Sequence, residues 1–282
     1  MAFNWKTFWT RASTALIFVA VMLTGLFWNQ YAFFLLFTVI HFGCWYEYQQ
    51  LVGKFEPRYT KITPVHRWAV QIAGWCVLLY FTGDQFVWGD LSLHAVGWWT
   101  GLLLLFMLPI TELLFSRNIE LINIRYSFLG VLYISLSFGL LMHLRTLPEI
   151  GKIAPLAIIF TIWINDTMAY LVGSMIGRTP LSVISPKKTW EGTLGGIILA
   201  VATLSIWAWL IDLPVHHAIA ISLIAAISGT FGDLLESKLK RMAGVKDSGQ
   251  IMPGHGGFLD RFDSLLLATP FVWVYFQLFI LR

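Results

Sequence analysis

The amino-acid sequence predicts an all-α fold, a polytopic helical integral membrane protein with about nine transmembrane helices. Composition is the first reason: 57% of the 282 residues are hydrophobic and only 12% are charged, whereas a soluble domain carries about 25% charged residues. The second reason is the repetition of apolar runs of about 17–25 residues, the length that crosses a bilayer as a helix. So little sequence lies outside these runs that we expect one helical membrane domain without a separate soluble domain.

Nine apolar runs account for the predicted spans, at residues 12–28, 31–49, 67–83, 95–115, 126–144, 153–177, 193–212, 217–236 and 263–281. The first run is followed by Asn29 and Gln30 and not by a small-residue cleavage site. We therefore expect a retained span and not a removed signal peptide. Cys44 and Cys76 both fall inside apolar runs, so neither a structural disulfide nor a cysteine metal site is expected.

Lysine and arginine residues concentrate on one side of the predicted bilayer. Sixteen of the 19 lie at the N-terminus or in loops of that side, and the other side holds Arg145, Lys152 and Arg282. Basic loops stay in the cytoplasm, so we expect the N-terminus, the loop near residue 185 and residues 233–263 to face it. The net charge of +4 then reflects contact with anionic lipid headgroups and gives no indication of nucleic-acid binding.

A carboxylate lies inside the sixth span, where charge is costly. Asp166 follows Asn165 and precedes Tyr170, with Gly173 and Gly177 at the spacing of a helix-packing face. A carboxylate near mid-membrane costs roughly 2.5–3.5 kcal/mol, so it should face a cavity or a partner. The alternative is that Asp166 makes only a buried structural hydrogen bond. The presence of Asn165 and the two glycines beside it favours a functional site.

Two lysines follow this span in a short polar loop. Lys187 and Lys188 come after Ser185 and precede Glu191, at the predicted start of the next helix. Free N–H groups and the helix dipole at such a start favour a phosphate or pyrophosphate, and lysine adds positive charge. Simple contact of the lysines with lipid headgroups is the alternative.

The densest polar segment is 233–263, which holds ten of the chain's 34 charged residues between two apolar runs. If the eighth helix continues past Gly232, then Asp233, Glu236, Ser237 and Lys240 share one face. Converging carboxylates repel one another unless a cation lies between them. An all-oxygen set of ligands suits Mg²⁺, and neighbouring lysines and arginines suit phosphate, the combination used in phosphoryl or nucleotidyl transfer. A solvated loop that balances its own charge is the alternative.

Residues 237–241, 246–249, 253–257 and 260–263 closely resemble the signature of phosphatidate cytidylyltransferases, also called CDP-diacylglycerol synthases. Residues 185–192 and the pattern from Asp166 to Gly173 resemble further motifs of that family. The resemblance extends over about 155–282. It implies catalysis by the region 151–282, with 1–150 supplying transmembrane helices for substrate access, packing and dimerisation.

The resemblance also implies a bacterial inner-membrane enzyme that condenses CTP with phosphatidic acid into CDP-diacylglycerol and pyrophosphate. It implies Mg²⁺ bound by Asp233 and Asp260, a possible K⁺ beside it, and a homodimer. Glu236 and Asp263 would support the metal. Lys240, Arg241 and His255 join the two aspartates as predicted catalytic residues, with a structural hydrogen bond as the alternative for His255. The predicted substrate-binding residues are Asp166, Tyr170, Ser185, Lys187, Lys188, Ser237, Lys246, Asp247 and Arg261.

Three other functions remain open at this point. A CTP-dependent lipid-alcohol kinase of the dolichol or phytol type has a related C-terminal motif, but the full signature argues against it. A transporter would use Asp166 and the other carboxylates as ion sites and tends to have repeated halves, which the sequence lacks. A catalytically inactive paralogue conflicts with the intact charged motifs.

Overall fold

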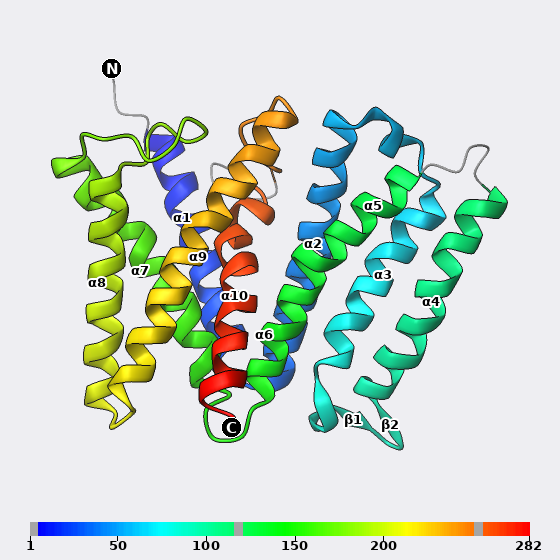
Figure 1. The fold of residues 1–282 in the computed structure, drawn as a ribbon, viewed down its shortest axis with the longest axis horizontal. Coiled ribbons are helices and arrows are strands. Elements are labelled where there is room, and N and C mark those ends of the chain that lie inside the picture. Colours follow the sequence, from blue (N-terminus) through cyan, green and yellow to red (C-terminus); the bar gives the residue numbers. More distant parts are fainter. Residues whose placement is uncertain (1–4, 116–120, 251–255) are drawn as a thin grey trace. The chain divides into compact units, whose positions relative to one another are not determined.

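The computed structural model describes residues 5–115, 121–250 and 256–282 and is helical almost throughout (Figure 1). Its α-helices are α1 Trp5–Phe27, α2 Gln30–Phe55, α3 Pro64–Tyr80, α4 Leu93–Phe115, α5 Leu121–Gly130, α6 Ser137–Thr146, α7 Ile153–Ile176, α8 Trp190–Leu210, α9 Val215–Met242 and α10 Leu259–Phe279. The shorter elements are η1 Pro57–Lys61, η2 Gly83–Gln85, the π-helical turn η3 Val131–Leu136, and a small hairpin of β1 Val87–Trp88 and β2 Leu91–Ser92.

The predicted fold class is confirmed, since each of the predicted spans coincides with helix. Among the described residues, six helices are long and apolar enough to cross a membrane, at 93–112, 122–146, 153–176, 190–210, 215–242 and 259–279. A shorter apolar helix covers Ser13–Phe27. The helices α2 and α3, over the predicted spans 31–49 and 67–83, fall outside both groups, so a total of nine membrane crossings stays a prediction.

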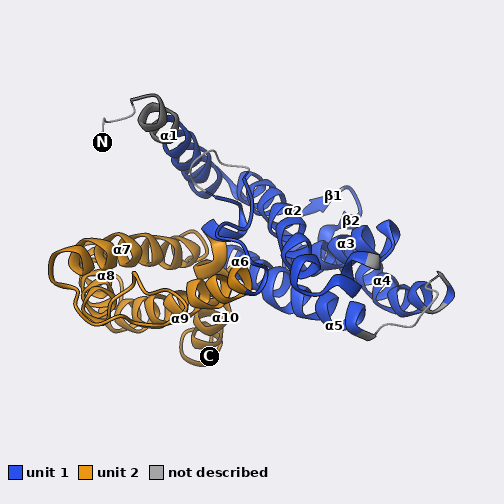
Figure 2. Ribbon diagram, turned by 90° about the horizontal axis from the view of Figure 1, so that it is seen from above, with its two compact units in different colours: residues 1–146, 242–261 blue, residues 147–241, 262–282 orange. Residues whose placement is uncertain are grey.

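The chain divides into two compact units (Figure 2). Unit 1 comprises residues 1–146 and 242–261, and unit 2 comprises 147–241 and 262–282. The predicted functional division at residue 150 lies close to the first boundary. Residues 242–261, however, belong to the same unit as the N-terminal helices. The signature segment, residues 237–263, is therefore divided between the two units.

Unit 1 is built around α2, whose large side chains Phe33, Phe37 and Trp45 are fully buried. The π-helical turn η3 brings the Ser135 hydroxyl to this core. It accepts from the indole N–H of Trp45 at 2.9 Å and lies 3.0 Å from the His41 imidazole. Polar groups in an apolar interior need such partners, so the π turn supplies one hydroxyl that Trp45 and His41 share.

Unit 2 is organised by close helix pairs. Glycine lines the contact between α7 and α8: a Cβ added at Gly192 would lie 2.6 Å from the Ala169 carbonyl oxygen, and one added at Gly196 would lie 2.6 Å from that of Asn165. Small residues allow two membrane helices to approach this closely. This packing places the polar residues of α7 beside the loop that leads into α8.

Candidate functional site

A polar pocket of about 450 Å³ lies in unit 2, bounded by α7, the loop 177–189 and α9. It contains six of the residues predicted to act at the site: Asp166, Tyr170, Ser185, Lys187, Lys188 and Asp233. Asn165 and Thr193 also line it. The structure therefore brings together residues that are up to 67 positions apart in the chain, counted from 166 to 233.

The loop before α8 is held in shape by hydrogen bonds to the first turn of that helix. Thr189 caps α8 by accepting from the Gly192 N–H at 3.1 Å. The Glu191 carboxylate accepts from the backbone N–H groups of Arg178 and Thr179 at 3.1 and 3.2 Å, and from the Thr179 hydroxyl at 2.8 Å. Glu191 thus fixes the entry of the loop, which leaves Lys187 and Lys188 to project from its other end.

The face predicted for α9 is confirmed, because the helix continues without a break through Met242. Gly232 makes this possible beside α10: a Cβ there would lie 2.5 Å from the Asp263 carbonyl oxygen and 3.0 Å from the Ser264 Cα. The two backbones approach so closely that Asp233 and Glu236 on α9 come next to Asp263 on α10.

These three carboxylates form a cluster in which one oxygen of each lies within 4.8 Å of the others. Glu236 is fully buried and Asp263 is 7% exposed. Lys240, one turn along α9, reaches the Glu236 carboxylate at 2.5 Å. An all-oxygen set of ligands at this spacing, two of them buried and Asp233 half-buried, fits a hard divalent cation such as Mg²⁺.

Lys188 connects the loop to the cluster by pairing with the Asp233 carboxylate. Ser237, one turn further along α9, donates its hydroxyl to the same carboxylate at 3.3 Å. Burial lowers the pKa of the Lys188 ammonium, and the carboxylates of Asp166 and Asp263 oppose that shift. The lysine thus lies among carboxylates whose charge favours its protonated form, against the effect of burial.

Asp260 lies in unit 1, in the first turn of α10, and holds the backbone of the signature segment. Its carboxylate accepts from the N–H groups of Ser248 at 2.9 Å and of Gly257 at 2.8 Å, and it lies 2.9 Å from the Ser248 hydroxyl oxygen. A hydrogen bond to a charged acceptor is about twice as strong as a neutral one. The aspartate therefore holds two parts of the signature segment, at Ser248 and Gly257, against the start of α10.

Glu47, in the middle of α2, completes this network and was not anticipated from the sequence. Its buried carboxylate accepts from the Ser248 hydroxyl at 2.7 Å and from the N–H groups of Phe258 and Leu259 at 2.9 and 2.8 Å. A lone acid within the predicted span 31–49 was the available signal, since a carboxylate in an apolar run calls for partners. Those partners lie about 200 residues later, and the sequence does not reveal them.

The remaining predicted residues are more dispersed. Lys246 and Asp247 line a separate polar pocket of about 580 Å³ in unit 1, together with Glu47 and Lys54. Arg241, at the end of α9 in unit 2, and Arg261, in unit 1, are exposed. His255 lies outside the described residues.

Comparison with known proteins identifies the family of the chain. The model of the cytidylyltransferase family matches residues 9–279, nearly the whole chain. The chain belongs to the cytidylyltransferase family. The resemblance of the signature segment is thereby confirmed, and the match also includes the N-terminal helices, for which the sequence motifs gave no support.

Curated members of the cytidylyltransferase family include relatives of moderate identity. A phosphatidate cytidylyltransferase of Bacillus subtilis is 41% identical over 154 residues, which cover 54% of this chain and 57% of that protein. One of Haemophilus influenzae is 35% identical over 206 residues, covering 68% and 69%. A chloroplastic one of Arabidopsis thaliana is 41% identical over 130 residues, covering 45% and 33%. The chain thus spans little more than half the length of the Bacillus relative.

Proposed function

We propose that this chain transfers the CMP moiety of CTP to phosphatidic acid, giving CDP-diacylglycerol and pyrophosphate in phospholipid biosynthesis. Its membership of the cytidylyltransferase family and the names of its relatives support this activity. The observation that carries the proposal is the pocket of unit 2, where lysines and clustered carboxylates meet beside membrane-length helices. That is the place where a soluble nucleotide and a lipid phosphate can be held together.

In this reaction the protein contributes mainly by positioning the two substrates and by neutralising their negative charge. An oxygen of the phosphatidic acid monoester attacks the α-phosphorus of CTP, and the bond from that phosphorus to the oxygen bridging to the β-phosphorus breaks. Pyrophosphate leaves with the bonding electrons. The phosphate monoester is already anionic at neutral pH, so no strong general base is required, and catalysis comes from alignment and neutralisation of charge.

Mg²⁺ is the metal that we propose for the carboxylate cluster, held by Asp233, Glu236 and Asp263. Asp260 is proposed as a ligand on the family resemblance, and K⁺ as a possible second ion on the same ground. When bound, Mg²⁺ neutralises the phosphate oxygens and polarises the reacting phosphorus.

The cationic side chains around the cluster would hold phosphate groups. Lys188 and Lys240 each contact a carboxylate, and we propose that they, with Lys187 and Arg241, bind the phosphates of CTP or of the lipid. Asp166 and Tyr170 would line the nucleotide cavity. The other proposed substrate or catalytic contacts are Ser185, Ser237, Lys246, Asp247, His255 and Arg261.

The finer assignments of place and assembly are also proposals. The excess of lysine and arginine on one side supports an inner-membrane protein with its N-terminus and active site in the cytoplasm. We propose a homodimer on the family resemblance, and the exposed apolar faces of the membrane helices leave room for one.

The test is incubation of the purified protein in detergent micelles with CTP and phosphatidic acid, with Mg²⁺ withheld and then restored. We expect CDP-diacylglycerol and equimolar pyrophosphate only when Mg²⁺ is present, and loss of both in a folded Asp233→Asn variant. Release of CDP with phosphorylation of a lipid alcohol would instead identify a kinase. Full activity of Asp233→Asn would remove Asp233 from the metal site.

A further inference from the structure

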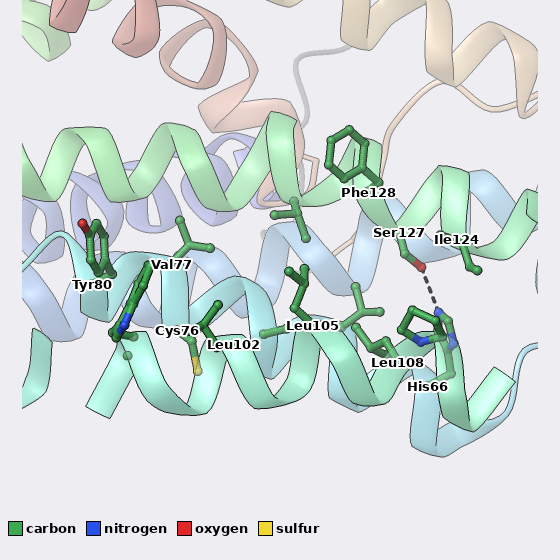
Figure 3. Close-up of a pocket in the computed structure, with 17 residues that line it drawn as sticks. His66, Cys76, Val77, Tyr80, Leu102, Leu105, Leu108, Ile124, Ser127 and Phe128 are labelled. Carbon is green, nitrogen blue, oxygen red and sulfur yellow. Dashed lines mark hydrogen bonds between the residues drawn. The ribbon is translucent and has the colours of Figure 1, made fainter. Parts of the chain in front are cut away.

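A second and almost wholly apolar cavity lies in unit 1, among α3, α4, α5 and η3 (Figure 3). Its volume is about 420 Å³, and its walls are formed by side chains such as Val70, Ala73, Leu102, Leu105 and Val131. The wall helices include α4 and the segment 122–146, both long and apolar enough to cross a membrane. None of its lining residues belongs to the polar pocket of unit 2.

One end of this cavity is polar. His66 and Ser127 line it, with the imidazole Nε2 3.0 Å from the hydroxyl oxygen, and they lie at the opposite end from Tyr80 (Figure 3). Behind them, the His66 Nδ1 is 3.1 Å from the Glu112 carboxylate, which also accepts from the Asn123 amide at 2.8 Å. All four polar side chains are at least 90% buried.

The contacts Ser127–His66–Glu112 resemble the catalytic triad of a hydrolase. The backbone around Ser127 argues against that function. Ser127 is the seventh residue of α5, so the backbone N–H groups around it are committed to helical hydrogen bonds. An acyl-transfer site needs free N–H donors aimed at the developing oxyanion. The network instead gives the cavity a fixed polar end within an apolar wall.

The surface around the polar end is basic. The exposed cations there are Lys54, Arg58, Arg67 and Arg125, where α2 ends and α3 and α5 begin, and one acid, Glu56, pairs with Arg58. The Arg67 guanidinium donates to the Thr60 carbonyl oxygen at 3.0 Å, and that of Arg125 lies over the Tyr126 ring, so both stay at this end of the helices. The opposite end of the same helices, around η2 and the β hairpin, has the exposed acids Asp84 and Asp90. The His66 and Ser127 end of the cavity therefore lies toward the basic ends of these helices, and the Tyr80 end lies toward the acidic ones.

We propose that this cavity binds one acyl chain of an anionic phospholipid, with its phosphate held near Arg67 and Arg125. The lining of α3 runs from His66 to Tyr80, about 21 Å of helix. The hydrocarbon of one leaflet is about 15 Å thick, so the chain fits along the apolar wall while its ester and phosphate lie at the polar and basic end. Each lysine or arginine near a membrane surface strengthens binding of an anionic headgroup about fivefold.

Photolabelling in reconstituted vesicles tests this site. The full-length protein is placed in phosphatidylcholine vesicles that contain a trace of phosphatidylglycerol with a diazirine in its acyl chain. This anionic lipid is not a substrate of the proposed reaction, so its labelling is independent of turnover. We expect adducts on the cavity-lining residues of 66–80, 97–109 and 124–131, and stronger competition by unlabelled phosphatidylglycerol or phosphatidic acid than by added phosphatidylcholine.

Two pairs of variants separate the cavity from general contact with lipid. Leu105→Trp fills the cavity, whereas Leu103→Trp changes a residue outside the lining on the same helix, and both leucines are 60% exposed. Arg67→Gln removes a cation at the polar end, whereas Lys152→Gln removes an exposed cation in unit 2. We expect Leu105→Trp to abolish cavity adducts and Arg67→Gln to weaken competition by anionic lipid about fivefold, with both controls unchanged.

Three results would overturn the proposal. Adducts of equal strength in the two tryptophan variants would show only lipid at the protein surface. Equal competition by phosphatidylcholine would remove the selectivity for anionic lipid. Cross-links from the cavity to a second copy of the chain would mean that protein fills it.

Discussion

Glu47 should set the position of the signature segment, and Glu47→Gln tests this with the least change in volume. In the wild-type protein one carboxylate oxygen accepts from Phe258 N–H, and the other accepts from Leu259 N–H and from the Ser248 hydroxyl. Glutamine keeps one acceptor oxygen and replaces the other with a donor. At least one backbone N–H then faces an amide N–H inside a site where Glu47 is only 1% exposed.

The magnitude follows from the hydrogen bonds lost. A bond to a charged acceptor contributes about 1.5–3 kcal/mol net, so local opening of the segment should become about 10- to 150-fold easier. Hydrogen exchange resolved at the amides of Phe258 and Leu259 measures this directly, because exchange from the native state reports local opening. We also expect cytidylyl transfer to fall about tenfold or more, since small displacements in a transfer site are costly.

Glu112→Gln is the matched control, because Glu112 is a buried carboxylate of the same unit whose partners are His66 and Asn123. It should leave exchange at Phe258 and Leu259 unchanged. Exchange at these amides as slow as in the wild-type protein, in a folded Glu47→Gln variant, would refute this role of Glu47. A Glu47→Asp variant that restored neither exchange protection nor activity would further show that the reach of the side chain matters as well as its charge.

Three further substitutions probe the close contacts of unit 2. Gly232→Ala pushes α9 away from the backbone of α10 and should destabilise the protein by about 1–3 kcal/mol. Gly229→Ala is its control, because an added Cβ there lies 3.5 Å from its nearest neighbours. This control should leave thermal unfolding nearly unchanged. Glu191→Gln releases the loop before α8, so the KM for CTP should rise more than kcat falls, and an unchanged KM contradicts this role. Lys240→Gln leaves buried Glu236 without its ammonium partner at 2.5 Å, which should cost about 3–5 kcal/mol, and thermal unfolding with and without Mg²⁺ measures it.

Much of unit 2 could be predicted from the sequence because its signals are local. The apolar runs fix the helices, and the spacing of Asp233, Glu236 and Lys240 places them on one face once α9 continues past Gly232. Helix boundaries were less accessible: α8 begins at Trp190 and α10 at Leu259, before the predicted spans. These first turns are polar and lie outside the apolar run, and their start is set by capping and side-chain hydrogen bonds instead of hydropathy.

The long-range contacts could not be predicted. Glu47 and Ser248 are 201 positions apart, and nothing in either local pattern specifies that they meet. The same holds for His66 and Ser127, which are 61 positions apart and come together only through the packing of unit 1. Hydropathy identifies a polar residue that needs a partner in the membrane, but the partner depends on how the helices are arranged.

Four acidic residues differ in what faces them, and the difference indicates which of them can exchange ligands. Glu47 and Glu191 accept from backbone N–H groups, which cannot leave without opening the fold. Asp233 and Glu236 instead face the ammonium groups of Lys188 and Lys240, which swing on flexible side chains. A divalent cation that takes over the neutralisation of these carboxylates would release both lysines for phosphate oxygens. The unfolding deficit of Lys240→Gln should therefore shrink when Mg²⁺ is added, because the ion substitutes for the missing ammonium, and a deficit of equal size with and without Mg²⁺ would contradict the exchange.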